Sequence, residues 1–278
     1  MKTEMMRIVF TGIIALMLGT AGIGPAGTTD TYQPGTVFVP KGITLEKNTY
    51  VYDSKKADLN SDGIEDDVVL YGVKEYEDSP FVGNIGIAVK NGQTREFSAA
   101  SIGELNVGYE PQIYIGSFTK PLSQDILVSL ATGGSGGVYQ YSLLVYQDDQ
   151  VKGIVTQKDL NQGLELETQC LPGYKLSVID KSTNFRTTVD LGQGSVNYEE
   201  MGIYNKEGEL LKNPMVLVDG YGVLKPEDED NDGILELQGI QRISVGFHAN
   251  TVAYAESTWK ISNNKMKLIS ERIKDKLD

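Results

Sequence analysis

The sequence predicts an all-β fold, with about four repeat units of roughly 57 residues that form propeller-like blades or a related β-repeat architecture. Three observations predict it. Two-residue turn signals recur at an almost constant spacing, the residues around them alternate between apolar and polar as strands do, and no long amphipathic helix with caps is found.

The turn signals between apolar-rich flanks are Asn91-Gly92, Asp148-Asp149, Glu207-Gly208 and Asn263-Asn264. Their spacings are 57, 59 and 56 residues. Asn-Gly is the strongest of the four signals, because both residues tolerate the positive φ of a type I′ hairpin turn. Apolar side chains recur at every second position over residues 85–89 and 139–145, which is typical of strands that precede the first two turns.

A loop that leads into an apolar run lies about thirty residues before each turn. These loops begin at Asp58, Ser117 and Asp228, and we expect the missing member near Gly173 and Tyr174, where the acidic residues are absent. The continuous apolar runs after the first two loops suit strands that are covered on both faces, and a buried helix turn is the alternative that gives the same pattern. The inferred units lie near 54–107, 113–165, 170–222 and 224–276, in one β-repeat domain over residues 54–278.

The first 26 residues have the order of a secretory signal peptide. Lys2 and Arg7 precede an uncharged stretch from Ile8 to Thr29, which starts with an apolar centre and continues with small residues. This order favours cleavage near Ala26 and export to the bacterial envelope or medium; an N-terminal membrane anchor is the alternative. We expect residues 27–53 to form a tether or edge strand, and no membrane span after cleavage.

Composition excludes several function classes. The chain has 25 lysine and arginine residues against 38 aspartate and glutamate residues, a formal net charge of −13, which argues against nucleic acid and anionic membranes as partners. The single cysteine, Cys170, excludes an internal disulfide and a thiolate metal cluster. The single histidine, His248, excludes sites that need two imidazoles. Excess carboxylate suits a cation.

Two loops carry the chemistry of a calcium site. Oxygen-bearing side chains stand at positions 1, 3, 5 and 9 of each loop, with glycine at position 6 (Gly63 or Gly233). Calcium binds six to eight oxygen ligands, glycine allows the tight turn, and the carbonyl of residue 7 adds another oxygen. Position 12 is Val69 or Gly239 where an EF-hand needs an acid, and strand-like residues follow, so these loops are not EF-hands. Two copies favour calcium over a solvated turn.

ADLNSDGIEDDVVLYG and EDEDNDGILELQGI resemble the calcium loops of FG-GAP/VCBS-type repeats, which build integrin-like β-propellers. The resemblance implies two ligand sets in which the isoleucines contribute their carbonyls: Asp58, Asn60, Asp62, Ile64 and Asp66; and Asp228, Asp230, Asp232, Ile234 and Glu236. The second unit resembles a degenerate copy, in which Ser117, Thr119, Pro121 and Leu122 replace the pattern and Asp125 is left. We expect no ion in that copy.

The remaining motifs favour structural roles. The glycine-rich run 131–137 lacks the Lys-Ser/Thr of a P-loop and predicts a turn between strands. His248 has no Ser or Cys nucleophile motif beside it, which favours a structural histidine over a general base. No catalytic residue is assigned. A pair of carboxylates for glycoside hydrolysis stays open, because the sequence does not tell which acids stand at a productive separation.

Two functions follow from these patterns. The favoured function is a secreted, calcium-binding scaffold or binding module for an extracellular or envelope ligand, either protein or glycan. The alternative is a secreted hydrolase with structural calcium. We further expect the fourth-unit loop to depend more on calcium than the first, because it has four carboxylates where the first has three and Asn60.

Overall fold

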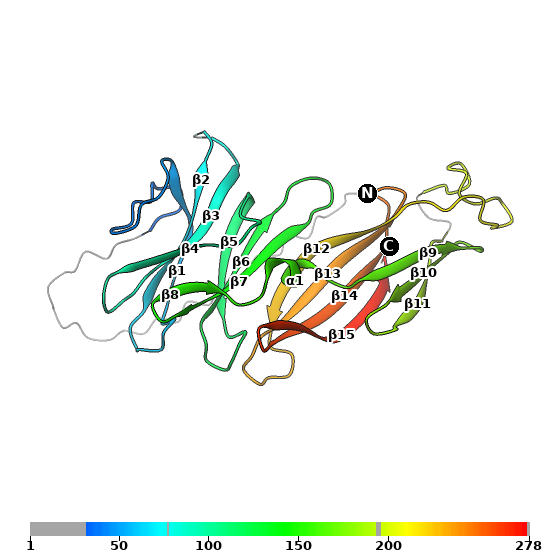
Figure 1. The fold of residues 1–278 in the computed structure, drawn as a ribbon. Coiled ribbons are helices and arrows are strands. Elements are labelled where there is room, and N and C mark those ends of the chain that lie inside the picture. The colour runs from blue at the N-terminus through cyan, green and yellow to red at the C-terminus, as the bar shows by residue number, and fades with distance from the viewer. Residues whose placement is uncertain (1–31, 77, 193–195, 277–278) are drawn as a thin grey trace, which may run out of the picture. The chain divides into compact units, whose positions relative to one another are not determined.

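The computed structural model describes residues 32–276, apart from 77 and 193–195, and Tyr32–Asp278 is one compact unit (Figure 1). The predicted signal peptide, residues 1–26, lies outside the described residues. The regular secondary structure of the described part is antiparallel β-strand, apart from one short helix, α1, Gln157–Asn161. The all-β prediction is therefore confirmed.

The first sheet has eight strands. Its order is β1-β2-β3-β5-β6-β7-β8, and β4 pairs with β3 off this path. The strands are β1 Thr49–Ala57, β2 Asp66–Lys74, β3 Phe81–Lys90, β4 Phe97–Ser101, β5 Gly108–Gly116, β6 Asp125–Ala131, β7 Tyr139–Gln147 and β8 Gln150–Gly153. The first and second predicted units thus contribute strands to one common sheet.

Two smaller sheets follow along the chain. The order of one is β11-β10-β9, and that of the other is β12-β13-β14-β15. The strands are β9 Leu166–Leu171, β10 Lys175–Asp180, β11 Arg186–Asp190, β12 Val216–Glu227, β13 Glu236–Val245, β14 Thr251–Ser262 and β15 Lys265–Asp275. None of the described sheets is closed, and the sheets do not correspond one for one to four blades.

The strands that follow the first two loops are buried on both faces, as their apolar runs predict. On β2, Val68 and Leu70 lie in a core cluster with residues of β3, β5 and β6, whereas Val69 and Tyr71 lie in another cluster with Phe38. On β6, the side chains on its two faces likewise enter different clusters. Burial of both faces fixes the start of each strand, and so fixes the end of the preceding loop.

The segment before β1 packs on the first sheet. Val37 pairs with Tyr50 in an isolated bridge, and the Phe38 N–H donates to the Thr49 carbonyl. The Phe38 side chain is 3% exposed and stacks on the Tyr71 ring at 5.6 Å between centroids. Residues 32–48 therefore cover one face of the sheet beside β1.

The strongest turn signal joins two antiparallel strands, β3 and β4, but not through the predicted two-residue type I′ turn. Asn91 and Gly92 lack the positive φ of a type I′ turn, which Asp148-Asp149 and Asn263-Asn264 both adopt. Asn91 Oδ1 instead accepts the N–H groups of Gln93 and Thr94, while the Gly92 N–H donates to Asp66 Oδ1. The Asn91-Gly92 prediction was wrong because side-chain bonds and the neighbouring loop favour a longer connection from β3 to β4.

Candidate metal centre

The two acidic loops have equivalent places in the fold, because each joins two antiparallel strands that are neighbours in a sheet. Loop 58–66 joins β1 to β2, and loop 228–236 joins β12 to β13. Each loop has two residues with positive φ, at positions 4 and 6: Ser61 and Gly63 in one, and Asn231 and Gly233 in the other. The glycine at position 6 adopts the left-handed conformation for which its residue type was predicted.

The first-unit loop is closed by its own carboxylates. Asp58 accepts the N–H groups of Asp62, at 3.0 Å, and Gly63, at 2.9 Å. Asn60 Oδ1 accepts the Asp62 N–H at 3.1 Å, and Asp62 Oδ1 accepts the Ile64 N–H at 2.8 Å. These bonds turn the side chains at positions 1, 3 and 5 toward the inside of the loop.

The fourth-unit loop repeats this pattern bond for bond. Asp228 accepts the N–H groups of Asp232 and Gly233, both at 3.1 Å. Asp230 Oδ1 accepts the Asp232 N–H at 3.1 Å, and Asp232 Oδ1 accepts the Ile234 N–H at 2.8 Å. Two distant segments with the same spacing therefore fold into the same loop.

The carboxylate at position 9 closes each loop from the strand side. Asp66 is fully buried, and its Oδ2 accepts the Leu59 N–H at 2.9 Å. Glu236 is 3% exposed, and its Oε2 accepts the Glu229 N–H at 3.0 Å. The strand therefore presents a buried carboxylate beside the more exposed side chains at positions 3 and 5.

The fourth-unit loop brings three acids into the range of one ion. One ligand oxygen from each of Asp228, Asp230 and Glu236 lies within 4.8 Å of the others. Oxygens that share a calcium ion at about 2.3–2.6 Å are separated by no more than about 5 Å. The donor set and its separation fit calcium, which would be held by these residues together with Asp232 and the Ile234 carbonyl.

A lysine lies among these carboxylates. Lys260 Nζ, on β14, is 2.6 Å from Asp232 Oδ2, 2.9 Å from Glu236 Oε1 and 3.3 Å from Asp230 Oδ2. Lys260 is not among the residues predicted for this site from the sequence. The pairing register of β13 and β14 is the signal that identifies it. Leu237 pairs with Trp259, so the residue after Trp259, which is Lys260, lies opposite Glu236.

The pKa directions separate the two loops. Burial raises the pKa of Asp66, and the charges of Asp62 and Asp58 add to that rise, although hydrogen bonds from Gly92 and Leu59 oppose it. The hydrogen bond from Lys260 instead lowers the pKa of Asp232. The same contact raises the pKa of Lys260. Repulsion between carboxylates therefore acts on the first loop, whereas an ammonium offsets it in the fourth.

The second-unit loop satisfies its remaining carboxylate with protein donors. Asp125 Oδ2 accepts the Phe118 N–H at 2.9 Å and the Thr119 N–H at 2.8 Å. The Thr119 hydroxyl, at 2.9 Å, and the Ser123 hydroxyl, at 2.8 Å, donate to the same oxygen. The Phe118 bond matches those of Leu59 and Glu229, so the loop keeps its closure without the acids at positions 1, 3 and 5.

The second-unit loop lies beside each of the two acidic loops. The Leu235 N–H donates to the Ser117 carbonyl at 2.7 Å and so joins the fourth-unit loop to the second. Residues of the first and second loops, including Asn60 and Asp125, line a common hollow of about 520 Å³. The degenerate loop therefore bonds to the fourth-unit loop and shares a hollow with the first-unit loop.

The other residues that stand out in the sequence are His248, the glycine-rich run 131–137 and Cys170. The first two are bonded to charged side chains, and Cys170 is buried. His248 Nδ1 lies 2.9 Å from Asp219 Oδ1, and Arg242 Nη2 lies 3.2 Å from Asp219 Oδ2. Arg242 also donates to the carbonyls of Ser135 and Gly136, in the glycine-rich connection between β6 and β7. Cys170 is a buried free thiol whose pKa is raised by burial.

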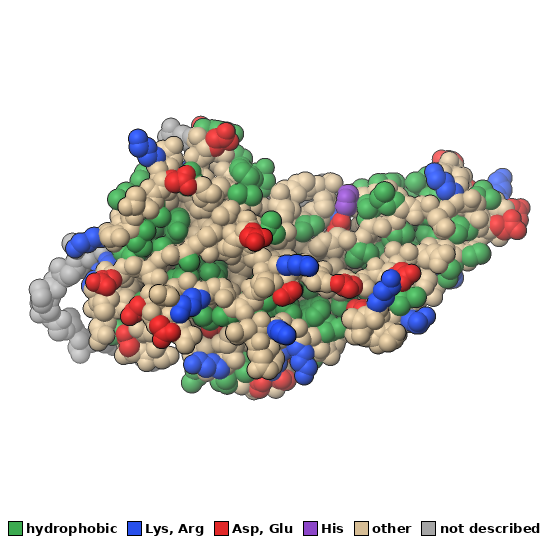
Figure 2. All heavy atoms as spheres, in the orientation of Figure 1, with side chains coloured by type: hydrophobic (Ala, Val, Ile, Leu, Met, Phe, Trp, Pro, Cys, Tyr) green, Lys and Arg blue, Asp and Glu red, His purple; other side chains and the backbone are tan. Residues whose placement is uncertain are grey.

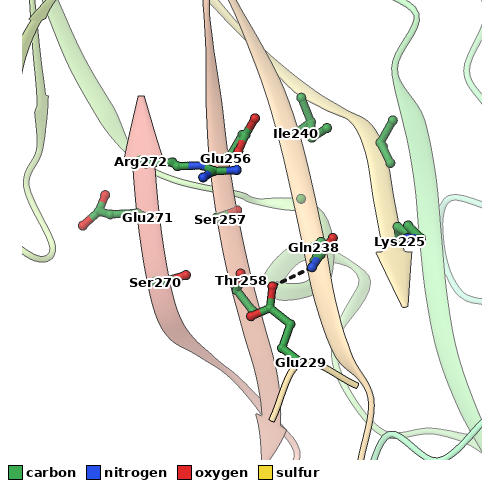
Figure 3. A pocket seen from close by; sticks show the side chains of 12 residues that line it. Lys225, Glu229, Gln238, Ile240, Glu256, Ser257, Thr258, Ser270, Glu271 and Arg272 are labelled. Atoms are coloured by element: carbon green, nitrogen blue, oxygen red, sulfur yellow. Dashed lines mark hydrogen bonds and ion pairs between the residues drawn. The ribbon is translucent and has the colours of Figure 1, made fainter. Parts of the chain in front are cut away.

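A polar groove of about 410 Å³ lies on the face of the β12–β15 sheet (Figure 3). Glu256 forms ion pairs with Arg272 and Lys274 there, and Gln238 donates to Glu229, which follows the first position of the fourth-unit loop. Acidic and basic side chains are also interspersed over the face of the molecule in Figure 2. The groove therefore offers charges of both signs and amide groups.

The fold and the loops together define a class: all-β chains of open antiparallel sheets with acidic loops between strands. Residues 164–274 match the family described as the YybI C-terminal domain. A Bacillus subtilis (strain 168) protein described as uncharacterized protein YybI is 31% identical over 208 residues, which cover 74% of this chain and 78% of that protein. The chain belongs to the YybI family.

A solved structure described as that of a Xanthomonas type IV secretion system related protein aligns with 78% of this chain and 98% of that one. The identity is 15% and the TM-score is 0.21, too low to support a structural argument. In the part of the chain that the structure describes, no helix has the length and apolar character needed to cross a bilayer.

Proposed function

We propose that the chain is an exported, calcium-stabilised binding or scaffold module of the bacterial envelope or medium. The observation that carries the calcium proposal is the matching set of hydrogen bonds from backbone N–H groups in two distant loops, which turns oxygen side chains of the same spacing inward. The convergence of Asp228, Asp230 and Glu236 supports it. The order of charges and apolar residues in 1–26 supports export.

The repeat is part of the same proposal. Three segments each have a strand, a loop closed by a position-9 carboxylate, and two further antiparallel strands: β1–β3, β5–β7 and β12–β14. We propose that these segments are divergent FG-GAP/VCBS-type units, each starting one strand earlier than its loop. The propeller-like arrangement of blades remains the finer proposal.

The groove on β12–β15 is the proposed ligand surface. Its exposed amide, hydroxyl and charged groups suit a polar ligand such as a glycan or a polar protein segment. It adjoins the fourth-unit loop through the bond between Gln238 and Glu229, so order in that loop supports order at the groove.

The calcium proposal is tested by thermal unfolding of the purified chain in millimolar calcium, in millimolar magnesium and in chelator. A ligand that binds only the folded state raises Tm by mass action, and extracellular calcium modules have Kd values of roughly 10⁻⁴–10⁻³ M. We expect the highest Tm in calcium, because magnesium dehydrates reluctantly and needs a stricter octahedron. Identical curves in the three solutions would refute the calcium proposal.

A further inference from the structure

Lys260 occupies the space between the predicted ligands of the fourth-unit loop. Its Nζ reaches three of the four side chains, Asp230, Asp232 and Glu236, at 2.6–3.3 Å. Glu236 Oε1 is buried, and the Lys260 ammonium lies 2.9 Å from it. The positive charge therefore stands where the loop's oxygens converge.

The register of the strands explains why this loop differs from the other two. In each unit the loop's last carboxylate begins one strand, and the next strand of the hairpin places one residue opposite it. By that register the opposing residues are Asn91, Val145 and Lys260 in the first, second and fourth units. A cationic side chain occupies this position in the fourth unit alone of the three.

The side chain can also leave. Lys260 is 21% exposed, and its ammonium is held on a flexible four-carbon stem. An ammonium and a calcium ion cannot share the same carboxylate oxygens, because the two cations repel at that separation. Calcium entry therefore requires the lysine to move away from Asp232 and Glu236.

We propose that Lys260 is an internal competitor for calcium, so that the fourth-unit loop is held closed by its own ammonium until calcium displaces it. This rests on the proposed function, namely that the acidic loops bind calcium. The proposal also reverses the expectation, drawn from the number of carboxylates, that the fourth-unit loop depends more on calcium than the first. The fourth-unit loop binds calcium more weakly than its four carboxylates predict, and it loses less order when calcium is removed.

The test compares Lys260→Met with wild-type Lys260 in an Asp62→Ala background, which leaves the fourth-unit loop as the intact site. Calcium affinity is measured by isothermal titration of the full chain. We expect Lys260→Met to bind calcium about tenfold more tightly, since removal of the ammonium frees the oxygens. Lys260→Arg, which keeps the charge, should not show this gain.

Lys225→Met is the matched control. Lys225 lies on β12 and pairs with Glu227 at 2.6 Å, so its removal takes the same charge from the vicinity without touching a predicted ligand. We expect it to change the affinity less than twofold. Equal gains for Lys225→Met and Lys260→Met would overturn the competitor proposal, because general electrostatics would then explain both.

A second measurement guards against loss of folding. Without the ammonium the four carboxylates repel, so Lys260→Met should have a lower Tm in chelator and a larger rise on adding calcium. Lys260→Gln should behave in the same way, and folding of either variant only in calcium would also support the proposal. No gain in affinity with calcium still bound refutes the competitor alone. No calcium binding by the wild type or any variant refutes the proposed function and the competitor with it.

Discussion

Asp125→Ala should destabilise the chain without any involvement of calcium. Asp125 is 4% exposed, and a single oxygen of its carboxylate accepts two backbone N–H groups and two hydroxyls. After the substitution the hydroxyls of Thr119 and Ser123 can turn to other acceptors, but the N–H groups of Phe118 and Thr119 cannot. A buried donor without a partner costs about 1–3 kcal/mol. For these two donors the free energy of unfolding should therefore fall by about 2–6 kcal/mol.

Urea unfolding followed by circular dichroism measures this loss, in calcium and in chelator. We expect the same loss in both, since protein donors rather than an ion satisfy Asp125. Asp62→Ala is the contrast, because its side chain accepts from Ile64 and belongs to a predicted calcium loop. Its loss should be larger in calcium. A loss for Asp125→Ala that appears only in calcium would refute the reasoning and place an ion in the second-unit loop.

Three further predictions follow from close packing and burial. Gly92→Ala should cost about 1–3 kcal/mol in urea unfolding, because a Cβ there would lie 2.3 Å from the Glu65 carbonyl oxygen; an unchanged midpoint would contradict this. Burial raises the pKa of Glu271 in the folded protein. Above this raised pKa the ionised carboxylate lowers the free energy of unfolding, and below the pKa of the unfolded state it does not. Glu271→Gln should therefore stabilise at neutral pH, with the gain lost below about pH 4, and a gain independent of pH would refute this. The Cys170 thiol is 2% exposed and should resist a thiol reagent until urea unfolds the chain; rapid native labelling would contradict its burial.

The sequence predicts local structure here where burial and spacing act together. The apolar runs on β2 and β6 need cover on both faces, and their short length favours a strand over a buried helix segment. The spacing of oxygens and glycine in loop 58–66 predicts its conformation, because each bond joins residues at most seven positions apart. Local bonds of this kind can be derived from the residues that make them.

The features that were not predicted depend on distant partners. Asn91-Gly92 has the residues of a type I′ turn, but the Gly92 N–H donates to Asp66, 26 residues earlier. The two residues therefore do not adopt the positive φ of that turn. Lys260 reaches Asp232 from 28 residues away through the register of β13 and β14. The common sheet of the first two units likewise follows from the pairing of β3 with β5 at Phe81. The spacing of residues in the sequence does not predict this pairing.

In these loops the N–H at position 2 donates a hydrogen bond to the carboxylate at position 9. This bond holds the shape of the loop independently of the charges at positions 1, 3 and 5. It is present in all three copies, through Asp66, Asp125 and Glu236, whichever residues stand at positions 1, 3 and 5. A repeat unit can therefore lose its acids one substitution at a time while its two strands stay joined in the same geometry. Under the proposed function, the units can therefore diverge in calcium binding, because the hydrogen bond that holds each loop in shape does not involve positions 1, 3 and 5.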